Sequence, residues 1–334
     1  MTDLPGLDLA ALAAYLGTPP LTGEVIPGGR SNLTYRVTDG ARRWVLRRPP
    51  LGHVLATAHD MAREHRVISA LAATTVPVPE VELLCADPGV IGAPFYLMEE
   101  VPGVALRHRD QCPWLTPDKA RVLSERLVDV LADLHAVDPE AVGLADFGRP
   151  DGFLERQVAR WGKQLASSRS RELPGIDDLR DRLAATVPRS RRATVVHGDY
   201  RLDNVLVTED PVDISAVLDW EMATLGDPLA DVGLLCVYWR GVGLEDDPIT
   251  GTVSALPGFA TADDLVQRYA ARSGADVTGL GWYTAFGYFK LAVIVEGIHF
   301  RFTTGKTVGA GFDRIGRLTL PLVRQGLAAT SGER

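Results

Sequence analysis

The sequence predicts an α+β protein with two lobes, a small lobe built on an antiparallel β-sheet and a larger, mainly helical lobe. Before Pro102, short segments of β-branched and aromatic residues alternate with turn residues. Pro102 and Gly103 mark a change, because apolar stripes at helical spacing dominate the sequence beyond them. A chain of 334 residues usually divides its core, so we predict lobes at residues 1–101 and 102–334 with a ligand cleft between them.

Turn and cap signals order the elements of the first lobe. Gly17 ends a short amphipathic helix, and Asp39 with Gly40 forms a pair that is favoured in hairpin turns. The elements expected in this lobe are a helix at 7–16, strands at 33–37 and 44–47, a helix at 58–73, and strands at 81–85 and 95–98.

The second lobe opens with a cap signal at Thr116 and Pro117, ahead of a long amphipathic run. Short apolar strands then interrupt the helical pattern and carry acidic residues at their ends. The elements expected are helices at 118–135 and 152–168, strands at 194–196, 204–207 and 216–218, and further helices from residue 229 onward, among them one at 285–302.

Composition excludes several classes of partner. The net charge of −8 argues against nucleic-acid or anionic-membrane partners, because these need a basic face. The 3 cysteines are scattered and form no CxxC pair, which indicates neither a disulfide framework nor a zinc site. No apolar run is long enough to span a bilayer, and the N-terminus lacks the basic region of a signal peptide. We therefore expect a cytoplasmic protein with a small-molecule substrate, and its oligomeric state stays open.

The strongest functional signal is a set of polar residues at the ends of short strands. Asp199 follows one apolar strand, Asn204 comes five residues later, and Asp219 follows the next pair of strands. Phosphoryl transfer needs one carboxylate for the attacking hydroxyl, and a carboxylate and an amide oxygen for Mg²⁺. These three residues supply that set, with Asp199 as catalytic base and the other two as metal ligands. The alternative is a pair of capped turns with solvated carboxylates.

With these motifs the chain resembles the aminoglycoside-phosphotransferase and choline-kinase-like group of protein-kinase-like enzymes. The likeness is strongest to the branch that occurs alone in bacteria or joined to acyl-CoA dehydrogenase domains. The segments that carry it are Gly-Gly-Arg-Ser-Asn at 28–32, Leu-Arg-Arg-Pro at 46–49, the stretches 197–204 and 218–221, and Gly-Asp-Pro at 226–228 with Asp231. The resemblance implies a protein-kinase-like fold, ATP and Mg²⁺ as cofactors, and the roles given above for Asp199, Asn204 and Asp219. It also raises an acyl-CoA dehydrogenase as a partner.

Two neighbours of the catalytic set have supporting roles in this interpretation. We expect His197 to bond the backbone of the catalytic loop and not to act as an acid or base. Asp231 is expected to brace the same loop from the helix that follows.

The nucleotide is expected to contact three parts of the first lobe. At residues 28–32 the glycines let backbone N–H groups approach phosphate oxygens, although a plain hairpin turn explains the same pattern. Residues 95–103 fit the lobe hinge, where backbone bonds to adenine are expected. The residues assigned to these two segments are Gly28, Gly29, Ser31 and Asn32 for the phosphates, and Met98, Glu99 and Val101 for the base.

The third part is Arg47, which stands where the family pattern has a lysine. The resemblance implies that it holds the phosphates and that Glu64 on the next helix steadies it. Arginine binds phosphate as a planar fork, so nucleotide affinity or choice could differ from a lysine enzyme. A surface role is the alternative, and Arg48 competes for the position although strand alternation sends it to the opposite face.

The substrate end is expected on the helix at 285–302. Lys290 and Arg301 are eleven residues apart, close to three helical turns, and so share a face. Cations there suit a carboxylate or phosphate on the substrate, and a solvated helix face is the alternative. Together with the resemblance, this favours a hydroxyacyl or hydroxy-acid acceptor.

Other functions stay open at this point. The first is an aminoglycoside 3′-type phosphotransferase, which would need clustered acidic residues at the acceptor site. The second is a catalytically silent nucleotide-binding regulatory module, toward which only Arg47 leans. A protein kinase is disfavoured because no Ala-Pro-Glu segment follows Asp219.

Overall fold

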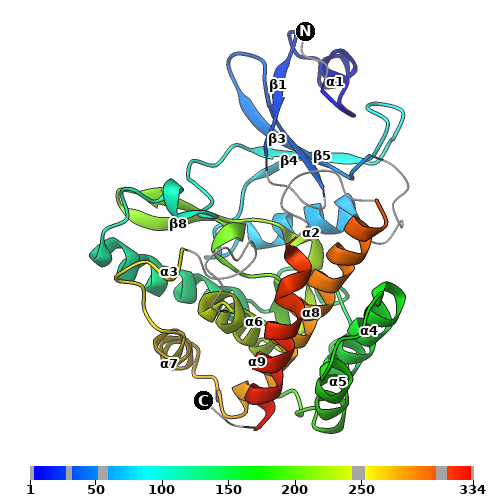
Figure 1. Ribbon diagram of the computed structural model, residues 1–334. Helices are drawn as coiled ribbons and strands as arrows, with labels where there is room; N and C mark the ends of the chain where they lie inside the picture. The colour runs from blue at the N-terminus through cyan, green and yellow to red at the C-terminus, as the bar shows by residue number, and fades with distance from the viewer. Residues whose placement is uncertain (1–3, 28–31, 52–58, 243–252, 306–313, 332–334) are drawn as a thin grey trace.

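A computed structural model describes residues 4–27, 32–51, 59–242, 253–305 and 314–331. It shows a small sheet lobe above a larger helical lobe (Figure 1). The predicted protein-kinase-like α+β fold is confirmed. Among the described residues, no helix is both long and apolar enough to cross a membrane.

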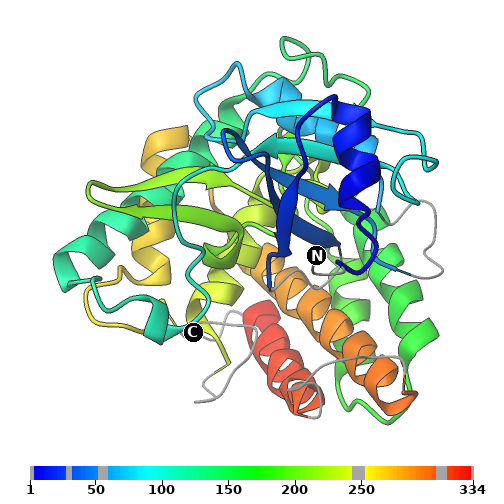
Figure 2. The same ribbon diagram turned by 90° about the horizontal axis from the view of Figure 1, so that it is seen from above.

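The first lobe is a five-stranded antiparallel sheet with the strand order β1-β2-β3-β5-β4. Figure 2 shows α1 (Leu9–Leu16) lying against this sheet. Asp8 caps the first turn of α1, and Gly17 ends the helix in a left-handed conformation. The strands are β1 (Thr22–Val25), β2 (Leu33–Thr38), β3 (Arg43–Arg48), β4 (Val81–Cys85) and β5 (Phe95–Glu99), and α2 (Met61–Leu71) follows β3.

Alternation along β3 decides what each face of the sheet contacts. Trp44 and Leu46 pack in the apolar cluster around α1, whereas Val45 packs in the cluster that contains α2. Arg47 is on the same face as Val45 and lines the cleft. Arg48 points the other way and donates to the carbonyl of Ile91 at 3.1 Å, as strand alternation predicts.

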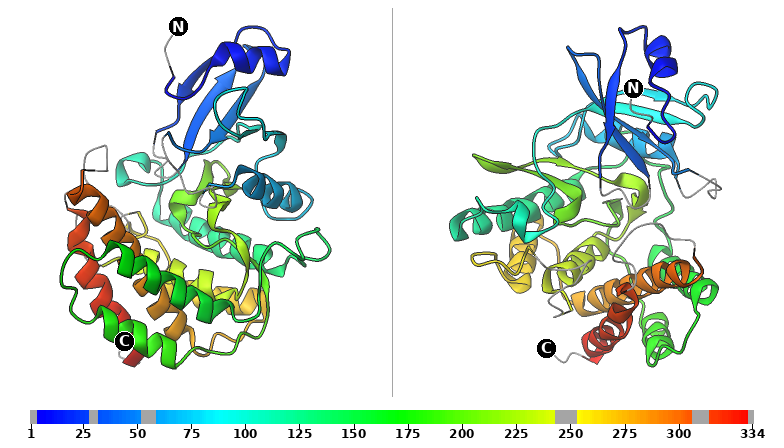
Figure 3. Two further views of the ribbon diagram at one scale, coloured as in Figure 1. Left: turned by 90° about the vertical axis from the view of Figure 1, so that its right-hand side faces the viewer. Right: turned by 45° about the horizontal axis from the view of Figure 1, so that its top comes forward.

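In the residues that the structure describes, the second lobe is mainly helical and contains two small strand pairs. In Figures 1 and 3, α8 and α9 lie beside one another, with α4 and α5 next to them. The helices are α3 (Pro117–Ala136), α4 (Phe153–Ser168), α5 (Ile176–Ala185), α6 (Leu229–Arg240), α7 (Ala262–Ser273), α8 (Leu280–Thr303) and α9 (Thr319–Ser331). The strand pairs are β6 (Thr194–Val196) with β9 (Thr224–Gly226), and β7 (Val205–Glu209) with β8 (Val212–Val217).

Two strands were not predicted, and both lack the usual signals. β1 reads Thr-Gly-Glu-Val and is largely exposed, so it shows no apolar alternation. β9 has 3 residues, too few for any period, and is held in place by pairing with β6. The predicted helix at 285–302 begins earlier, at Leu280, and Asp60 caps the helix that was expected to start at residue 58.

Candidate active site

A cleft of about 1140 Å³ opens where the sheet lobe meets the helical lobe. Its upper wall comes from β3, β5 and α2. Its lower wall comes from the loops around β7 and β8 and from α4, α6 and α8. Every predicted site residue that the structure describes, except Asn32, lines this cleft, and Asn32 contacts lining residues through hydrogen bonds. The predicted Gly28, Gly29 and Ser31 lie outside the described residues.

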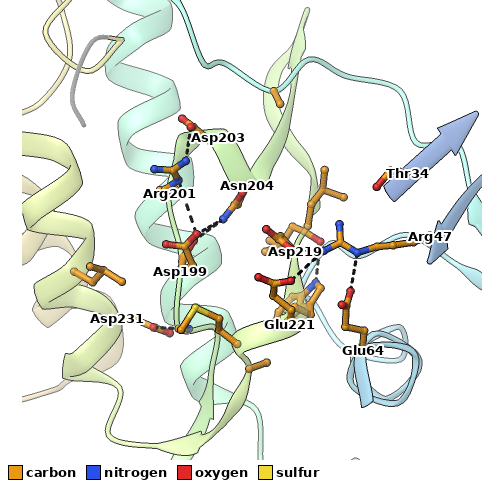
Figure 4. A pocket seen from close by; sticks show the side chains of 18 of the residues that line it. Thr34, Arg47, Glu64, Asp199, Arg201, Asp203, Asn204, Asp219, Glu221 and Asp231 are labelled. Carbon is orange, nitrogen blue, oxygen red and sulfur yellow. Dashed lines mark hydrogen bonds and ion pairs between the residues drawn. The ribbon is translucent and has the colours of Figure 1, made fainter. Parts of the chain in front are cut away.

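The β7–β8 hairpin brings Asn204 and Asp219 to one end of a strand pair. Val205 pairs with Val217, and the N–H of Leu218 donates to the carbonyl of Asn204 at 2.8 Å. Asp219 then adopts φ 66° and ψ 60°, a left-handed conformation that is uncommon for a residue with a side chain. The turn directs its carboxylate toward the sheet lobe (Figure 4).

Asp199 lies in the same loop region, and its carboxylate accepts hydrogen bonds on both oxygens. Asn204 Nδ2 donates to Oδ2 at 2.9 Å and to the Asp199 carbonyl at 2.8 Å (Figure 4). Tyr238 Oη donates to Oδ1 at 2.6 Å. Because Asn204 uses its amide nitrogen on Asp199, its Oδ1 is directed elsewhere and keeps its capacity as an oxygen ligand.

His197 and Asp231 hold the loop that presents Asp199. His197 Nε2 donates to the Leu218 carbonyl at 2.8 Å, and its Nδ1 accepts from the Asp199 N–H at 3.1 Å. Asp231 accepts the backbone N–H groups of His197 at 2.7 Å and Gly198 at 2.8 Å. Both residues therefore have the structural contacts that the sequence predicted.

Burial alone would raise the pKa of Asp231. The hydrogen bond from His135 and the nearby histidines and backbone N–H groups outweigh burial, and they hold this pKa below its ordinary value. Asp231 is therefore a fixed anion that accepts from the loop.

Arg47 joins the two lobes through carboxylates. Its Nε forms an ion pair with Glu64 at 2.9 Å, without the alignment of a hydrogen bond, and its Nη2 bonds Asp219. Glu221 is 3.8 Å away (Figure 4). Burial alone would lower the pKa of Arg47. The neighbouring carboxylates raise it by a larger amount, so the pKa lies above its ordinary value and the guanidinium stays charged. Only 11% of the side chain is exposed, so the alternative of a surface arginine is wrong.

Glu64 is the buried centre of this cluster. Its Oε2 accepts from Tyr96 Oη at 3.1 Å, and its Oε1 accepts from Asn32 Nδ2 at 3.0 Å. Asn32 also donates to Glu221 at 3.1 Å. In this structure the Asn32 amide therefore donates hydrogen bonds to two carboxylates, and its predicted contact with phosphate stays a prediction.

The hinge residues Met98, Glu99 and Val101 line the cleft where β5 ends. Met98 is buried, in agreement with a place in the pocket wall. The Glu99 N–H donates to the Glu80 carbonyl at 2.9 Å, so it already has an acceptor in the strand region. Contacts of Met98, Glu99 and Val101 with a base stay predictions.

Lys290 and Arg301 both lie on α8 and line the cleft, but in different surroundings. Lys290 is buried, donates to the Gly198 carbonyl, and has the Trp161 ring 5.5 Å away. Burial lowers the pKa of Lys290, and the charge of Asp199 opposes that shift. Arg301 is exposed, and a helical rise of about 1.5 Å per residue places it some 16 Å along the axis from Lys290. The alternative of a solvated helix face therefore fits Arg301, whereas it does not fit the buried Lys290.

Sequence reasoning missed the role of Tyr238 beside Asp199. A usable signal existed, because Asp231 and Tyr238 are seven residues apart on α6, two helical turns, and so share a face. Once Asp231 was assigned to the catalytic loop, this spacing pointed to Tyr238. No comparable signal marked Tyr96 or Glu221.

The donor set suits a hard divalent cation. Asn204 offers an amide oxygen and Asp219 a carboxylate, and Mg²⁺ prefers few protein oxygens with the remaining positions taken by water and phosphate. These two residues therefore fit the metal that the family implies.

Comparison with known proteins agrees with this geometry. The chain is 36% identical over 319 residues to acyl-CoA dehydrogenase family member 10 of Mus musculus, covering 93% of this chain and 29% of that protein. The chain spans less than half the length of the curated relatives that it matches first.

Solved structures show the same fold. A crystal structure from Ralstonia eutropha JMP134, named as a candidate aminoglycoside phosphotransferase, superposes with a TM-score of 0.83 at 33% identity, covering 97% of this chain and 98% of that one. A ternary complex of aminoglycoside phosphotransferase APH(4)-Ia with AMP-PNP and hygromycin B gives a TM-score of 0.63 at 17% identity, covering 97% and 98%. The family model for phosphotransferase enzymes (APH) matches residues 22–265. The chain therefore belongs to the APH phosphotransferase enzyme family.

Proposed function

We propose that this protein transfers the γ-phosphate of ATP to a hydroxyl group of a small anionic acceptor, with Mg²⁺ as cofactor. The observation that carries the proposal is the meeting of three groups at the cleft floor. The Asp199 carboxylate lies beside Asn204, and the hairpin places Asp219 next to Asn204 and opposite Arg47. Titratable and polar groups that gather in a cleft of this size are typical of a functional site.

In the proposed reaction Asp199 orients the acceptor hydroxyl and takes its proton. The acceptor oxygen forms a bond to the γ-phosphorus, the bond from that phosphorus to the β-bridging oxygen breaks, and ADP leaves with the electron pair. The proton passes to the Asp199 carboxylate. Positioning and charge stabilisation supply most of the rate enhancement in such reactions.

Asn204 Oδ1 and the Asp219 carboxylate would hold Mg²⁺. When bound, the ion neutralises charge on the phosphate oxygens. Arg47 would bind the phosphates, for which it would exchange its contact with Asp219 while keeping Glu64 as its partner. AMP-PNP in the APH(4)-Ia complex supports an adenine nucleotide as the donor.

The acceptor side of the cleft is formed by α4 and α8, and its chemistry favours an anion. From these helices the described lining residues include the cations Arg160, Lys290 and Arg301 and no carboxylate. A polycationic aminoglycoside would meet like charge here. The names of the curated relatives point to acyl-thioester chemistry, so we propose a hydroxy acid or hydroxyacyl thioester as the acceptor. Association with an acyl-CoA dehydrogenase is part of the same proposal.

An acceptor panel with ATP and Mg²⁺ tests the proposal. It contains hydroxy acids, their neutral amides, hydroxyacyl thioesters and aminoglycosides, with ADP release and product mass as readouts. We expect phosphorylated hydroxy acids or thioesters, with a lower KM for each acid than for its amide. Turnover of aminoglycosides alone would refute the acceptor class. Nucleotide binding without transfer to any acceptor would show a silent module instead.

Asp199→Asn is the matched catalytic variant. It keeps the size of the side chain but removes the proton acceptor, so kcat should fall about 10²–10⁴-fold. Nucleotide affinity, measured by calorimetry, should stay within about twofold because Asp199 takes no part in the proposed phosphate contacts. Asp181→Asn, which changes an exposed carboxylate on α5, is the control. Near-normal turnover in Asp199→Asn would contradict the mechanism.

A further inference from the structure

Tyr238 on α6 makes a short hydrogen bond to the proposed base. It is 7% exposed, lines the cleft, and donates from Oη to Asp199 Oδ1 at 2.6 Å. We infer that Tyr238 is a positioning residue that fixes the orientation of the Asp199 carboxylate for proton acceptance. The inference rests on the proposed role of Asp199.

Two donors are needed to fix the carboxylate because it can rotate about its last side-chain bond. Asn204 Nδ2 holds Oδ2 from the loop itself, at 2.9 Å. Tyr238 holds Oδ1 from a separate helix, and an O–H···O⁻ bond of this length is of the strong, charge-assisted kind. With both bonds made, the plane of the carboxylate is set by two elements of the fold.

Tyr238 is itself held in place from two directions. The Arg201 guanidinium lies 4.6 Å from the centre of its ring. Two turns earlier on the same face of α6, Asp231 binds the backbone N–H groups of His197 and Gly198. The helix α6 therefore bonds both the backbone of the catalytic loop and the side chain of Asp199.

The hydroxyl of Tyr238 stays a donor. Burial, and next the charge of Asp199, raise the pKa of Tyr238 well above its ordinary range. The phenol therefore keeps its proton at neutral pH and is no competing base. A carboxylate offers about four lone-pair positions, so Asp199 can accept the substrate hydroxyl while both of these bonds persist.

Steady-state kinetics of Tyr238→Phe test the inference. The substitution removes only the hydroxyl, and the loosened carboxylate should lower kcat about 10–100-fold, as misplacement of a reacting group does. The KM for nucleotide should stay within about twofold, since Tyr238 bonds Asp199 and not a residue that is proposed to bind the phosphates. In an Asp199→Asn background the same substitution should cause little further loss, because the group that it positions is already gone.

Tyr283→Phe is the matched control. It removes a comparable tyrosine–aspartate bond, from Tyr283 Oη to Asp227 Oδ2 at 2.8 Å, from a pair that does not line the cleft. Its kcat should equal that of the wild type.

Each outcome separates the inference from the function on which it rests. An unchanged kcat in Tyr238→Phe, or losses that multiply independently with Asp199→Asn, would overturn the positioning role alone. Failure of Tyr238→Phe to fold, seen by thermal denaturation, would show the bond to be structural and would also overturn it. A wild type that transfers phosphate to no acceptor would overturn the proposed function, and the role of Tyr238 with it.

Discussion

Arg47 shows why an arginine can serve where the family pattern has a lysine. Its fork reaches two acidic partners at once, with Nε on Glu64 and Nη2 on Asp219. An ammonium group is a compact point charge, so it would contact two carboxylates without the fixed geometry of a planar fork. Arg47 thus links the sheet lobe to the helical lobe.

Loss of the Arg47 charge should destabilise the protein strongly. In Arg47→Met, Glu64 stays buried without its counter-ion, and breaking a buried ion pair in this way costs about 3–5 kcal/mol of unfolding free energy. Urea denaturation measures the loss, and adding Glu64→Gln should recover part of it. Arg36→Met is the control, because the side chain of Arg36 is 43% exposed and exposed pairs contribute about 1 kcal/mol or less. Equal losses in the two single variants would contradict this account.

At the residue scale, the local part of the site could be predicted and the distant part could not. Asp199 and Asn204 are five positions apart, so their meeting follows from one loop. Arg47 and Asp219 are separated by 172 positions, and only the resemblance to a family suggested that they approach each other. Periodicity placed Lys290 and Arg301 on one face of a helix but could not show that only Lys290 is covered by neighbouring elements.

At the scale of elements, α6 organises the catalytic loop. Its first turn supplies Asp231 and its last turns supply Tyr238. The strand pairs beside it are short. β6 was predicted from its apolar residues, whereas β9 reads Thr-Leu-Gly and has neither an apolar run nor a period. Long amphipathic helices such as α3 were predicted closely, because their apolar stripes and cap residues can be recognised from residues that are close in sequence.

The contribution of Asp231 should depend on pH. Its folded-state pKa lies below the ordinary value of 3.8, so the stabilisation is present above that pH and is lost as pH falls through the folded-state pKa. In Asp231→Asn the amide nitrogen cannot accept from a backbone N–H, so the variant should be about 1–3 kcal/mol less stable at pH 7. Urea denaturation between pH 7 and pH 3 should show that the difference in unfolding free energy between Asp231→Asn and the wild type becomes smaller as the pH falls.

The control for this experiment is Asp178→Asn, an exposed helix carboxylate paired with Arg182. The unfolding free energy of Asp178→Asn should differ little from that of the wild type at every pH. If the difference for Asp231→Asn stayed constant down to pH 3, the buried carboxylate would not be the cause of the lost stability.

At the scale of the whole molecule, one apolar cluster crosses the predicted boundary at 101/102. It joins Ile68 and Met98 from the first lobe to Leu127 and Val205 from the second. A second cluster, which includes Leu12 and the outer face of the sheet, belongs to the first lobe alone. The division into lobes at 101/102 stays a prediction, and the shared cluster ties the two predicted lobes to one another.

Polar contacts reinforce the link between the lobes. Arg63 on α2 donates to the carbonyl of Ala223 at 3.0 Å, and the Val217 N–H donates to the Pro77 carbonyl at 2.8 Å. Separating the lobes would expose part of the shared cluster and leave these groups without partners. The unfolding free energies of the two lobes are therefore coupled through α2 and the segment that follows it.

This coupling predicts a single unfolding transition. Calorimetry should give one peak in which the calorimetric and van't Hoff enthalpies agree. Leu12→Ala and Leu127→Ala each remove a fully buried side chain, at about 2–5 kcal/mol, and should both shift that one peak. Independent lobes would instead give two peaks, and Leu12→Ala would then move only one of them. That outcome would place the physical boundary near 101/102 and would remove the interlobe cluster as a source of stability.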